Sequence, residues 1–163
     1  MRRLISGLLL AAFLAAPAAL AHHAGESYAA RDVVVSHAWT HENAPSAHAN
    51  AVFLTIVNDG DQPDRLTGVT GDFFSHAEIQ APVLDDAGVL RTQTIASLEI
   101  APGQSLTLQP GGVQIQLIGL QSSHFPGDHF DLTLQFEKAG ALTVEVEVEP
   151  LRRDDAEEPD SNV

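Results

Sequence analysis

The chain has 163 residues, a formal net charge of −14 at neutral pH and no cysteine. The negative charge argues against binding to nucleic acid or to anionic membranes, and the absence of thiols excludes disulfides and thiolate metal ligands. Since the single methionine is Met1, the rest of the chain also lacks a thioether.

The first 21 residues have the pattern of a cleavable export signal. Two arginines at 2–3 precede an apolar stretch at 4–16, and Ala-Leu-Ala at 19–21 supplies the small residues that signal peptidase accepts. The apolar stretch is too short to span a membrane, and no second one follows. We therefore expect a periplasmic protein of 142 residues, without a membrane span and with enough chain for one domain.

From Asp32 onward, apolar and polar residues alternate with a period of two, which is typical of half-buried strands. Turn formers such as Asn58-Asp59-Gly60 separate these stretches, and no stretch has the periodicity of an amphipathic helix. The eight or nine short strands predict an all-β Greek-key sandwich or barrel. The predicted strands are 33–39, 51–57, 65–69, 76–80, 89–94, 104–108, 113–120, 130–136 and 144–148.

The remaining segments set the domain boundaries. Residues 22–31 carry no strand pattern and are expected to form a mobile arm, which can span roughly 33 Å when extended. Residues 32–151 are the predicted β-domain. Residues 152–163 are rich in Asp, Glu and Pro and are expected to be a disordered acidic tail.

Several short motifs occur in a fixed order between Val33 and Val148. In this order they resemble the PCuAC family of periplasmic copper chaperones, and the resemblance implies a cupredoxin-like Greek-key fold. The motifs are Ser36-His37-Ala38-Trp39, Ala44-Pro45, the stretches 51–58, 98–103 and 108–112, Gly119-Leu120, Gly127-Asp128 and the stretch 132–136.

The resemblance also shows that the usual copper ligands of the family are missing. Its members bind Cu(I) through histidine and methionine. The spacing of these ligands along the family's sequences places the corresponding positions on Gln80, Thr92, Gln114 and Gln116. Amide and hydroxyl groups do not replace thioethers as ligands for Cu(I). The family's ligand set is therefore not transferred to this chain.

Eight histidines remain after residue 21, and they suit Cu(II), which prefers nitrogen ligands in a tetragonal plane. Cleavage after Ala21 makes His22 the new N-terminus, where the α-amine and the ring nitrogen can chelate one ion. A second imidazole completes a three-nitrogen histidine brace. Some PCuAC-like domains of copper-dependent bacteria bind copper in this way, and the sequence is similar to them.

His41 and His48 are the favoured sources of the second imidazole. His41 lies two positions beyond Trp39 on the same strand face, and His48 lies in the loop that follows. Trp39 itself is expected to pack in the core. An ordinary role as solvated loop residues remains open for both histidines.

The other histidines are reserves or spectators. His23 is adjacent to the terminus, His76 shares a strand face with the former copper position, and His37 is the third reserve, for which a structural role is favoured. His124 and His129 flank a turn and are expected not to bind metal.

Three functions remain open from the sequence. The favoured one is a copper-binding protein or chaperone that delivers Cu(II) to a periplasmic or membrane copper enzyme. The alternative is a metal-free binding or scaffold module that kept the fold and lost the site. A histidine-brace oxidase or monooxygenase is less favoured, since aromatic residues are few and no catalytic motif is present. We therefore expect no enzymatic activity.

Overall fold

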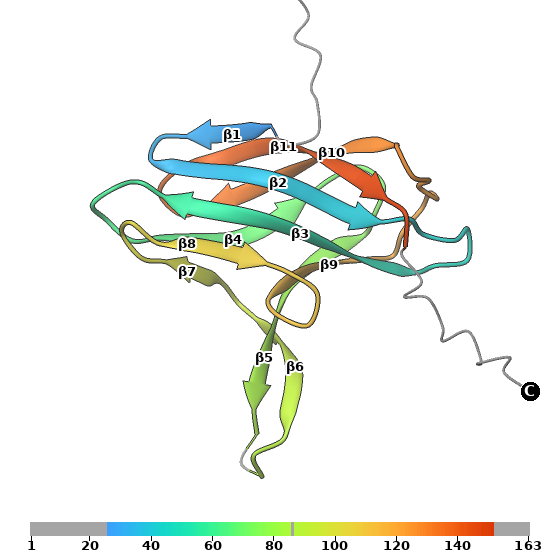
Figure 1. The fold of residues 1–163 in the computed structure, drawn as a ribbon, viewed down its shortest axis with the longest axis horizontal. Helices are drawn as coiled ribbons and strands as arrows, with labels where there is room; N and C mark the ends of the chain where they lie inside the picture. The colour runs from blue at the N-terminus through green and yellow to red at the C-terminus, as the bar shows by residue number, and fades with distance from the viewer. Residues whose placement is uncertain (1–25, 86, 152–163) are drawn as a thin grey trace, which may run out of the picture.

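The computed structural model describes residues 26–85 and 87–151, and every regular element in this part of the chain is a β-strand (Figure 1). None of the described residues belongs to a helix long and apolar enough to cross a membrane. The strands are β1 (Ser27–Ala30), β2 (Val33–His41), β3 (Ala49–Asn58), β4 (Asp64–Thr70), β5 (His76–Leu84), β6 (Leu90–Ile95), β7 (Leu98–Ile100), β8 (Ser105–Leu108), β9 (Gln114–Ile118), β10 (His129–Phe136) and β11 (Gly140–Glu149).

The described part of the chain thus has eleven strands rather than eight or nine. The two that the sequence pattern did not reveal are β1 and β7, which have only four and three residues. Alternation cannot be recognised over so few positions. β1 lies within the segment 22–31 that was expected to be a mobile arm, and it pairs with β2 from Ser27 opposite Ser36 to Ala30 opposite Val33.

The strands form one hydrogen-bonded path in the order β6-β5-β9-β3-β2-β11-β10-β4-β7, with β1 beside β2 and β8 beside β3. Within the described strands, all pairs are antiparallel except β2 with β11. The path folds over on itself, so that the inner sheet faces enclose a single core (Figure 1). The expected cupredoxin-like β-sandwich is confirmed.

The core is built by the apolar positions that alternate along the long strands. Their side chains are almost completely removed from water, and this burial is the main stabilising contribution in a chain without disulfides. The fully buried residues include Val33, Val35, Val52, Leu54, Ile56, Leu66, Ile100, Leu108, Ile115, Leu117, Leu132, Leu134, Val144 and Val146.

A β-bulge in β2 decides which side chains of that strand face the core. Ser36 pairs with Thr55 and Trp39 with Phe53, so three steps on β2 correspond to two steps on β3. His37, within the bulge, has a φ of 54°. The bulge reverses the alternation, because one extra residue exchanges the two faces of a strand. Residues 39 and 41 therefore point outward.

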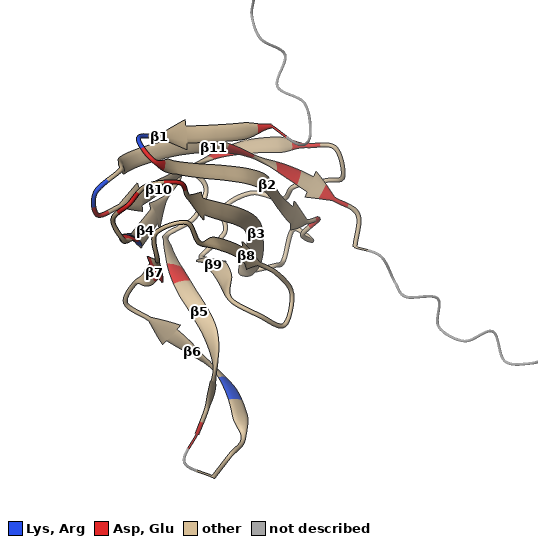
Figure 2. Cartoon of the chain, turned by 60° about the vertical axis from the view of Figure 1, so that its left-hand side comes forward, with Lys and Arg blue, Asp and Glu red and all other residues tan. Residues whose placement is uncertain are grey.

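The β5–β6 hairpin extends away from the body of the sandwich (Figure 1). Asp85 orders its turn: Oδ1 accepts hydrogen bonds from the N–H groups of Ala87 (3.0 Å) and Val89 (2.9 Å). The other carboxylate oxygen of Asp85 lies 2.6 Å from Nε of Arg91. The turn is closed by Gly88, whose φ of 76° suits glycine. Figure 2 shows acidic residues on β11 and around the ends of β1 and β2, and on the hairpin it shows acidic residues on β5 and near the tip and a basic residue on β6.

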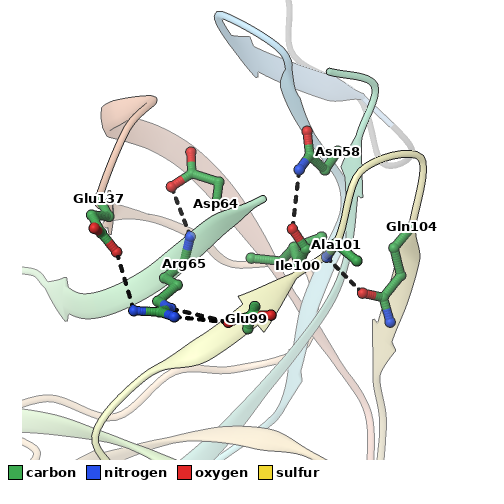
Figure 3. Close-up of polar contacts among 8 residues, drawn as sticks. All are labelled: Asn58, Asp64, Arg65, Glu99, Ile100, Ala101, Gln104 and Glu137. Carbon is green, nitrogen blue, oxygen red and sulfur yellow. Dashed lines mark hydrogen bonds and ion pairs between the residues drawn. The ribbon is translucent and has the colours of Figure 1, made fainter. Parts of the chain in front are cut away.

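Two buried polar side chains connect the loops at one end of the sandwich (Figure 3). Asn58 donates to the carbonyl groups of Gln62 (2.8 Å) and Ile100 (3.0 Å) and accepts from the N–H of Gly60 (3.0 Å). Asp64, at the start of β4, accepts from backbone N–H groups on two elements. These bonds supply partners for main-chain groups that the sheet leaves unpaired.

Candidate metal centre

One outward-facing sheet surface carries most of the residues that the sequence pointed to. It runs across β2, β3, β9 and β5, which are neighbours in the sheet. Val52, Ile115 and Ile79 point into the core from three of these strands. Because side chains alternate along a strand, the residues on either side of them point outward. This outer face contains Trp39, His41, Ala51, Phe53, Gln114, Gln116, His76, Glu78 and Gln80.

His41 lies at the end of β2 in this outer face. Its ring stands edge-on to Trp39, with centroids 5.0 Å apart, and lies 6.4 Å from the ring of Phe53. Its backbone carbonyl accepts a 2.7 Å hydrogen bond from Nδ2 of Asn50, which fixes the strand end. Nδ1 of His41 is buried and has no hydrogen-bond partner. A buried imidazole nitrogen without a partner is an available metal ligand.

The sequence predicted that Trp39 packs in the core, and this prediction was wrong. The bulge places Trp39 on the outer face, where it packs against Phe53 with ring centroids 4.6 Å apart. The bulge also explains the position of His41, because an unbroken alternation from Val33 and Val35 would have turned both side chains inward. The sequence showed that Trp39 and His41 share a face, but not which face.

His48 is solvent-exposed and immediately precedes β3. Its backbone carbonyl accepts hydrogen bonds from the N–H groups of Gly119 (2.8 Å) and Leu120 (3.3 Å), which tie the loop to the end of β9. Gly119 has a φ of 72°, and a Cβ there would lie 2.4 Å from Oγ of Ser75. The loop geometry near His48 therefore depends on a glycine at 119.

The former ligand positions of the PCuAC family do come together, except for Thr92. Gln80 lies opposite Gln114 in the sheet, whereas Thr92 lies opposite Pro82, further out along the hairpin. Nε2 of Gln114 lies 3.4 Å from Oε1 of Gln80 and 3.2 Å from Oε1 of Gln116. The three amides thus bind one another at the positions that the resemblance assigned to the family's copper ligands.

This amide network ends on Glu78. Oε2 of Glu78 accepts hydrogen bonds from Oγ1 of Thr94 (2.8 Å) and Nε2 of Gln80 (3.2 Å). The bond from Thr94, followed by that from Gln80, lowers the pKa of Glu78 below its usual value. The other oxygen, Oε1, lies 3.8 Å from Nε2 of the exposed His76. His76 and Glu78 thus form a surface pair at the margin of the network.

The described residues contain no group of three or more His, Asp or Glu side chains arranged to hold a metal ion. His22 and His23, the predicted terminal ligands, lie outside the described residues. His37 is exposed within the bulge of β2.

His124 and His129 have other contacts. Nδ1 of His129 lies 3.5 Å from Oε1 of Glu145. The ring of His124 packs against Phe73 and Phe130, with centroids 4.6 Å and 4.8 Å apart, and its Nδ1 lies 3.3 Å from Oδ1 of Asn43. Burial lowers the pKa of His124 below its usual value of 6.5. These contacts give His124 a packing role.

This lowered pKa leads to a testable pH dependence. Because folding lowers the pKa of His124, the unfolded chain binds this proton more readily than the folded state, so the stability falls as the pH drops below about 6.5. In a His124→Phe variant, which keeps the ring packing, the loss of stability between pH 7 and pH 5 should be smaller by up to about 1 kcal/mol. Urea unfolding at both pH values measures this, and equal losses in the two proteins would contradict it.

The sandwich indicates the class of the protein, because solved PCuAC domains have the same fold. The copper-bound PCuAC domain from PmoF2 has a TM-score of 0.68 and 25% identity, covering 77% of this chain and 99% of that domain. The apo PCuAC domain from PmoF1 has a TM-score of 0.68 and 26% identity, covering 77% and 100%. The Cu(I) form of DR1885 from Deinococcus radiodurans has a TM-score of 0.57 and 25% identity, covering 69% and 74%. The resemblance inferred from the sequence is confirmed.

The chain belongs to the LpqE-like family ("Putative lipoprotein LpqE-like"), which matches residues 33–148. A curated relative is "Putative lipoprotein Lxx21020" of Leifsonia xyli subsp. xyli (strain CTCB07). It is 28% identical over 116 residues, which cover 71% of this chain and 69% of the relative.

Proposed function

We propose that this protein is an exported copper-binding protein that holds Cu(II) in a histidine brace and delivers it to a copper enzyme of the cell envelope. The ligands are the α-amine and ring of His22 together with the ring of His41. Two similarities support copper as the cargo: one PCuAC structure is copper-bound and another holds Cu(I). The signal-like residues 1–21 and the lipoprotein names of the family and the relative support export.

The observation that carries the proposal is the unpaired Nδ1 of His41. Leaving a buried ring nitrogen without a hydrogen-bond partner destabilises the folded protein by about 1–3 kcal/mol relative to a state in which that nitrogen is hydrogen-bonded. Metal ligation removes that cost, because the lone pair then has an acceptor. Among the candidate histidines, His41 also has its orientation fixed by neighbours, since Trp39 and Phe53 enclose its ring.

The length of the preceding chain is compatible with this pair of ligands. β1 is antiparallel to β2, with Ser27 opposite Ser36, so the direction from Ala30 to Ser27 points toward the His41 end of β2. β11 pairs with Trp39–His41 on that edge, so a chain that reaches His41 has to leave the sheet edge before it. Since the bulge absorbs one residue, Ser36 and His41 are separated by about four strand steps, or roughly 13 Å. The five residues from Ser27 back to His22 span up to roughly 17 Å. The arm is therefore long enough.

The chemistry of the outer face favours Cu(II) over Cu(I). The chain after Met1 has no sulfur, and the family's usual ligand positions are occupied by amides that bind one another. Imidazole and amine nitrogens suit Cu(II). A site that depends on a terminal arm can also release its ion when the arm detaches, which suits delivery rather than catalysis.

The amide network supports one competing function. Because Gln80, Gln114 and Gln116 are already hydrogen-bonded to one another, the face is stable without metal. A metal-free binding module would have such a surface.

Titration of the secreted protein with Cu(II) separates the two functions. We expect one equivalent to bind, with an EPR spectrum typical of nitrogen ligands in a tetragonal plane. His41→Ala should weaken binding at least about 10-fold, which corresponds to 1.4 kcal/mol, whereas the matched control His129→Ala should not. His48→Ala tests the other favoured imidazole and should have little effect. Absence of saturable binding would favour the metal-free module.

A further inference from the structure

The β5–β6 hairpin concentrates the exposed apolar surface of the molecule. Six large hydrophobic side chains are exposed among the described residues, and four of them lie at the tip of this hairpin: Val83 (36%), Leu84 (66%), Val89 (49%) and Leu90 (62%). Leu84 and Leu90 lie directly opposite each other. Solvent-exposed clusters of this kind are typical of interaction surfaces.

The tip has a defined conformation. Asp85 fixes the turn through its bonds to the N–H groups of Ala87 and Val89 and through its ion pair with Arg91. A preformed hairpin loses little conformational entropy when it binds a partner. Asp85 thus connects the residues that follow it to the end of β5, beside the exposed apolar side chains.

The outer edge of β6 is also open. β6 is the last strand of the sheet path, and residues 90–94 are exposed. Edge strands are normally protected by lysine, proline, a bulge or a covering segment. β6 contains no lysine or proline, its pairing with β5 has no register shift, and its one charged residue, Arg91, is paired with Asp85 within the same hairpin.

Charge indicates which partner fits this edge. The β5–β6 hairpin from residue 76 to 95 carries a net charge of −2, but β6 itself contains one arginine and no acidic residue, whereas the whole chain carries −14. Two copies of so acidic a protein repel each other except where acidic residues are absent, and the β6 edge is such a place. Because the hairpin projects from the sandwich, two hairpins can pair while the acidic bodies stay apart (Figures 1 and 2). The overall negative charge disfavours anionic lipid as the partner.

We propose that two copies of this chain associate through the β6 edges of their hairpins, antiparallel across a two-fold axis near Thr92 and Gln93. With a two-fold axis, both copies contribute the same surface, the β6 edge, to the interface. Each β6 then forms the neighbouring strand for the β6 of the other copy. The leucine pairs at the two tips add apolar contact. This association is independent of the proposed copper site.

Sedimentation velocity across a range of protein concentrations tests the association. We expect a monomer–dimer equilibrium that shifts toward dimer as salt increases, because salt screens the repulsion between the acidic bodies. Leu90→Lys should raise the dissociation constant at least tenfold. The matched control is Leu151→Lys, which places the same charge on a leucine that is 56% exposed on the body, and it should leave the equilibrium unchanged.

A cysteine scan locates the interface without relying on the lysine variants. The chain has no cysteine, so Thr92→Cys or Gln93→Cys introduces a unique thiol, and mild oxidation should crosslink two copies there but not through Leu151→Cys. A protein that stays monomeric at all concentrations would overturn the proposal. So would a dimer that resists Leu90→Lys and fails to crosslink at 92 and 93, or hairpin-dependent binding to neutral phosphatidylcholine vesicles by a monomer.

Discussion

Replacing Asp64 with alanine should lower the free energy of unfolding by about 3 kcal/mol and the melting temperature by roughly 10 °C. The buried carboxylate accepts three short hydrogen bonds from the backbone N–H groups of Arg65 (2.7 Å), Lys138 (2.9 Å) and Ala139 (2.8 Å). The bonds from Lys138 and Ala139 connect the start of β4 to the turn between β10 and β11, and Figure 3 shows the bond from Arg65. Alanine leaves these N–H groups without their acceptor.

The effect of this substitution should depend on pH. Burial alone raises the pKa of Asp64, but the hydrogen bonds from Lys138, Arg65 and Ala139 together lower it below the usual value of 3.8. A lowered pKa means that the ionised carboxylate stabilises the fold above about pH 4, and that this contribution is lost as the pH falls through the folded-state value. The difference between the native protein and Asp64→Ala should therefore be largest near pH 7 and smaller at pH 3.

Urea unfolding monitored through Trp39 measures both effects. Asp61→Ala is the matched control, because Asp61 is an exposed aspartate of the preceding loop, and its loss should change stability by less than about 0.5 kcal/mol. Equal midpoints for the native protein and Asp64→Ala at pH 7 would show that water replaces the carboxylate without cost.

Much of this fold follows from local sequence. Period-two alternation identified every strand of five residues or more, and the acidic row of β11 faces outward as alternation requires. β1 and β7 were missed because three or four residues cannot show a period by themselves, whereas β8, which also has four residues, was predicted as the segment before the Pro110-Gly111-Gly112 turn. Asp64 was missed for a different reason: its three donors include two that lie more than 70 positions away in the sequence. No local pattern reports a contact of that range.

The outer face was predicted only in part. The resemblance to the PCuAC family identified Gln80, Gln114 and Gln116 as one site, and strand pairing brings them together. The outward position of His41 could not be predicted, because it depends on the bulge beside His37, where a non-glycine residue has a positive φ. Such a residue leaves no reliable signal in a single sequence.

The bulge connects the fold to the proposed function. Without it, residue 41 would point into the core, and no imidazole from β2 would reach the outer face. With it, the His41 ring lies beside Trp39 and Phe53, which limit the access of water to Nδ1. The same irregularity shortens the path from Ser36 to His41 by about one strand step, or roughly 3 Å.

Adding one glycine before His22 should weaken Cu(II) binding about 100-fold or more, with the EPR spectrum changing to that of fewer nitrogen ligands. The extension converts the terminal amine into an amide and separates it from the His22 ring, which destroys the chelate. A free α-amine has a pKa near 8, so affinity in the native protein should rise with pH up to about 8 and rise less in the extended protein.

The design includes a control for chain length and for processing. A glycine added after Val163 should leave binding unchanged, and mass spectrometry must first show that the secreted protein begins at His22. His41→Ala combined with the N-terminal glycine should be little weaker than the glycine extension alone if both remove parts of one site, since groups acting on one ion are not additive. Two full and additive losses would instead indicate two separate copper sites. An extended protein that binds Cu(II) as tightly as the native one would rule out the brace, leaving His41 as a ligand of some other arrangement.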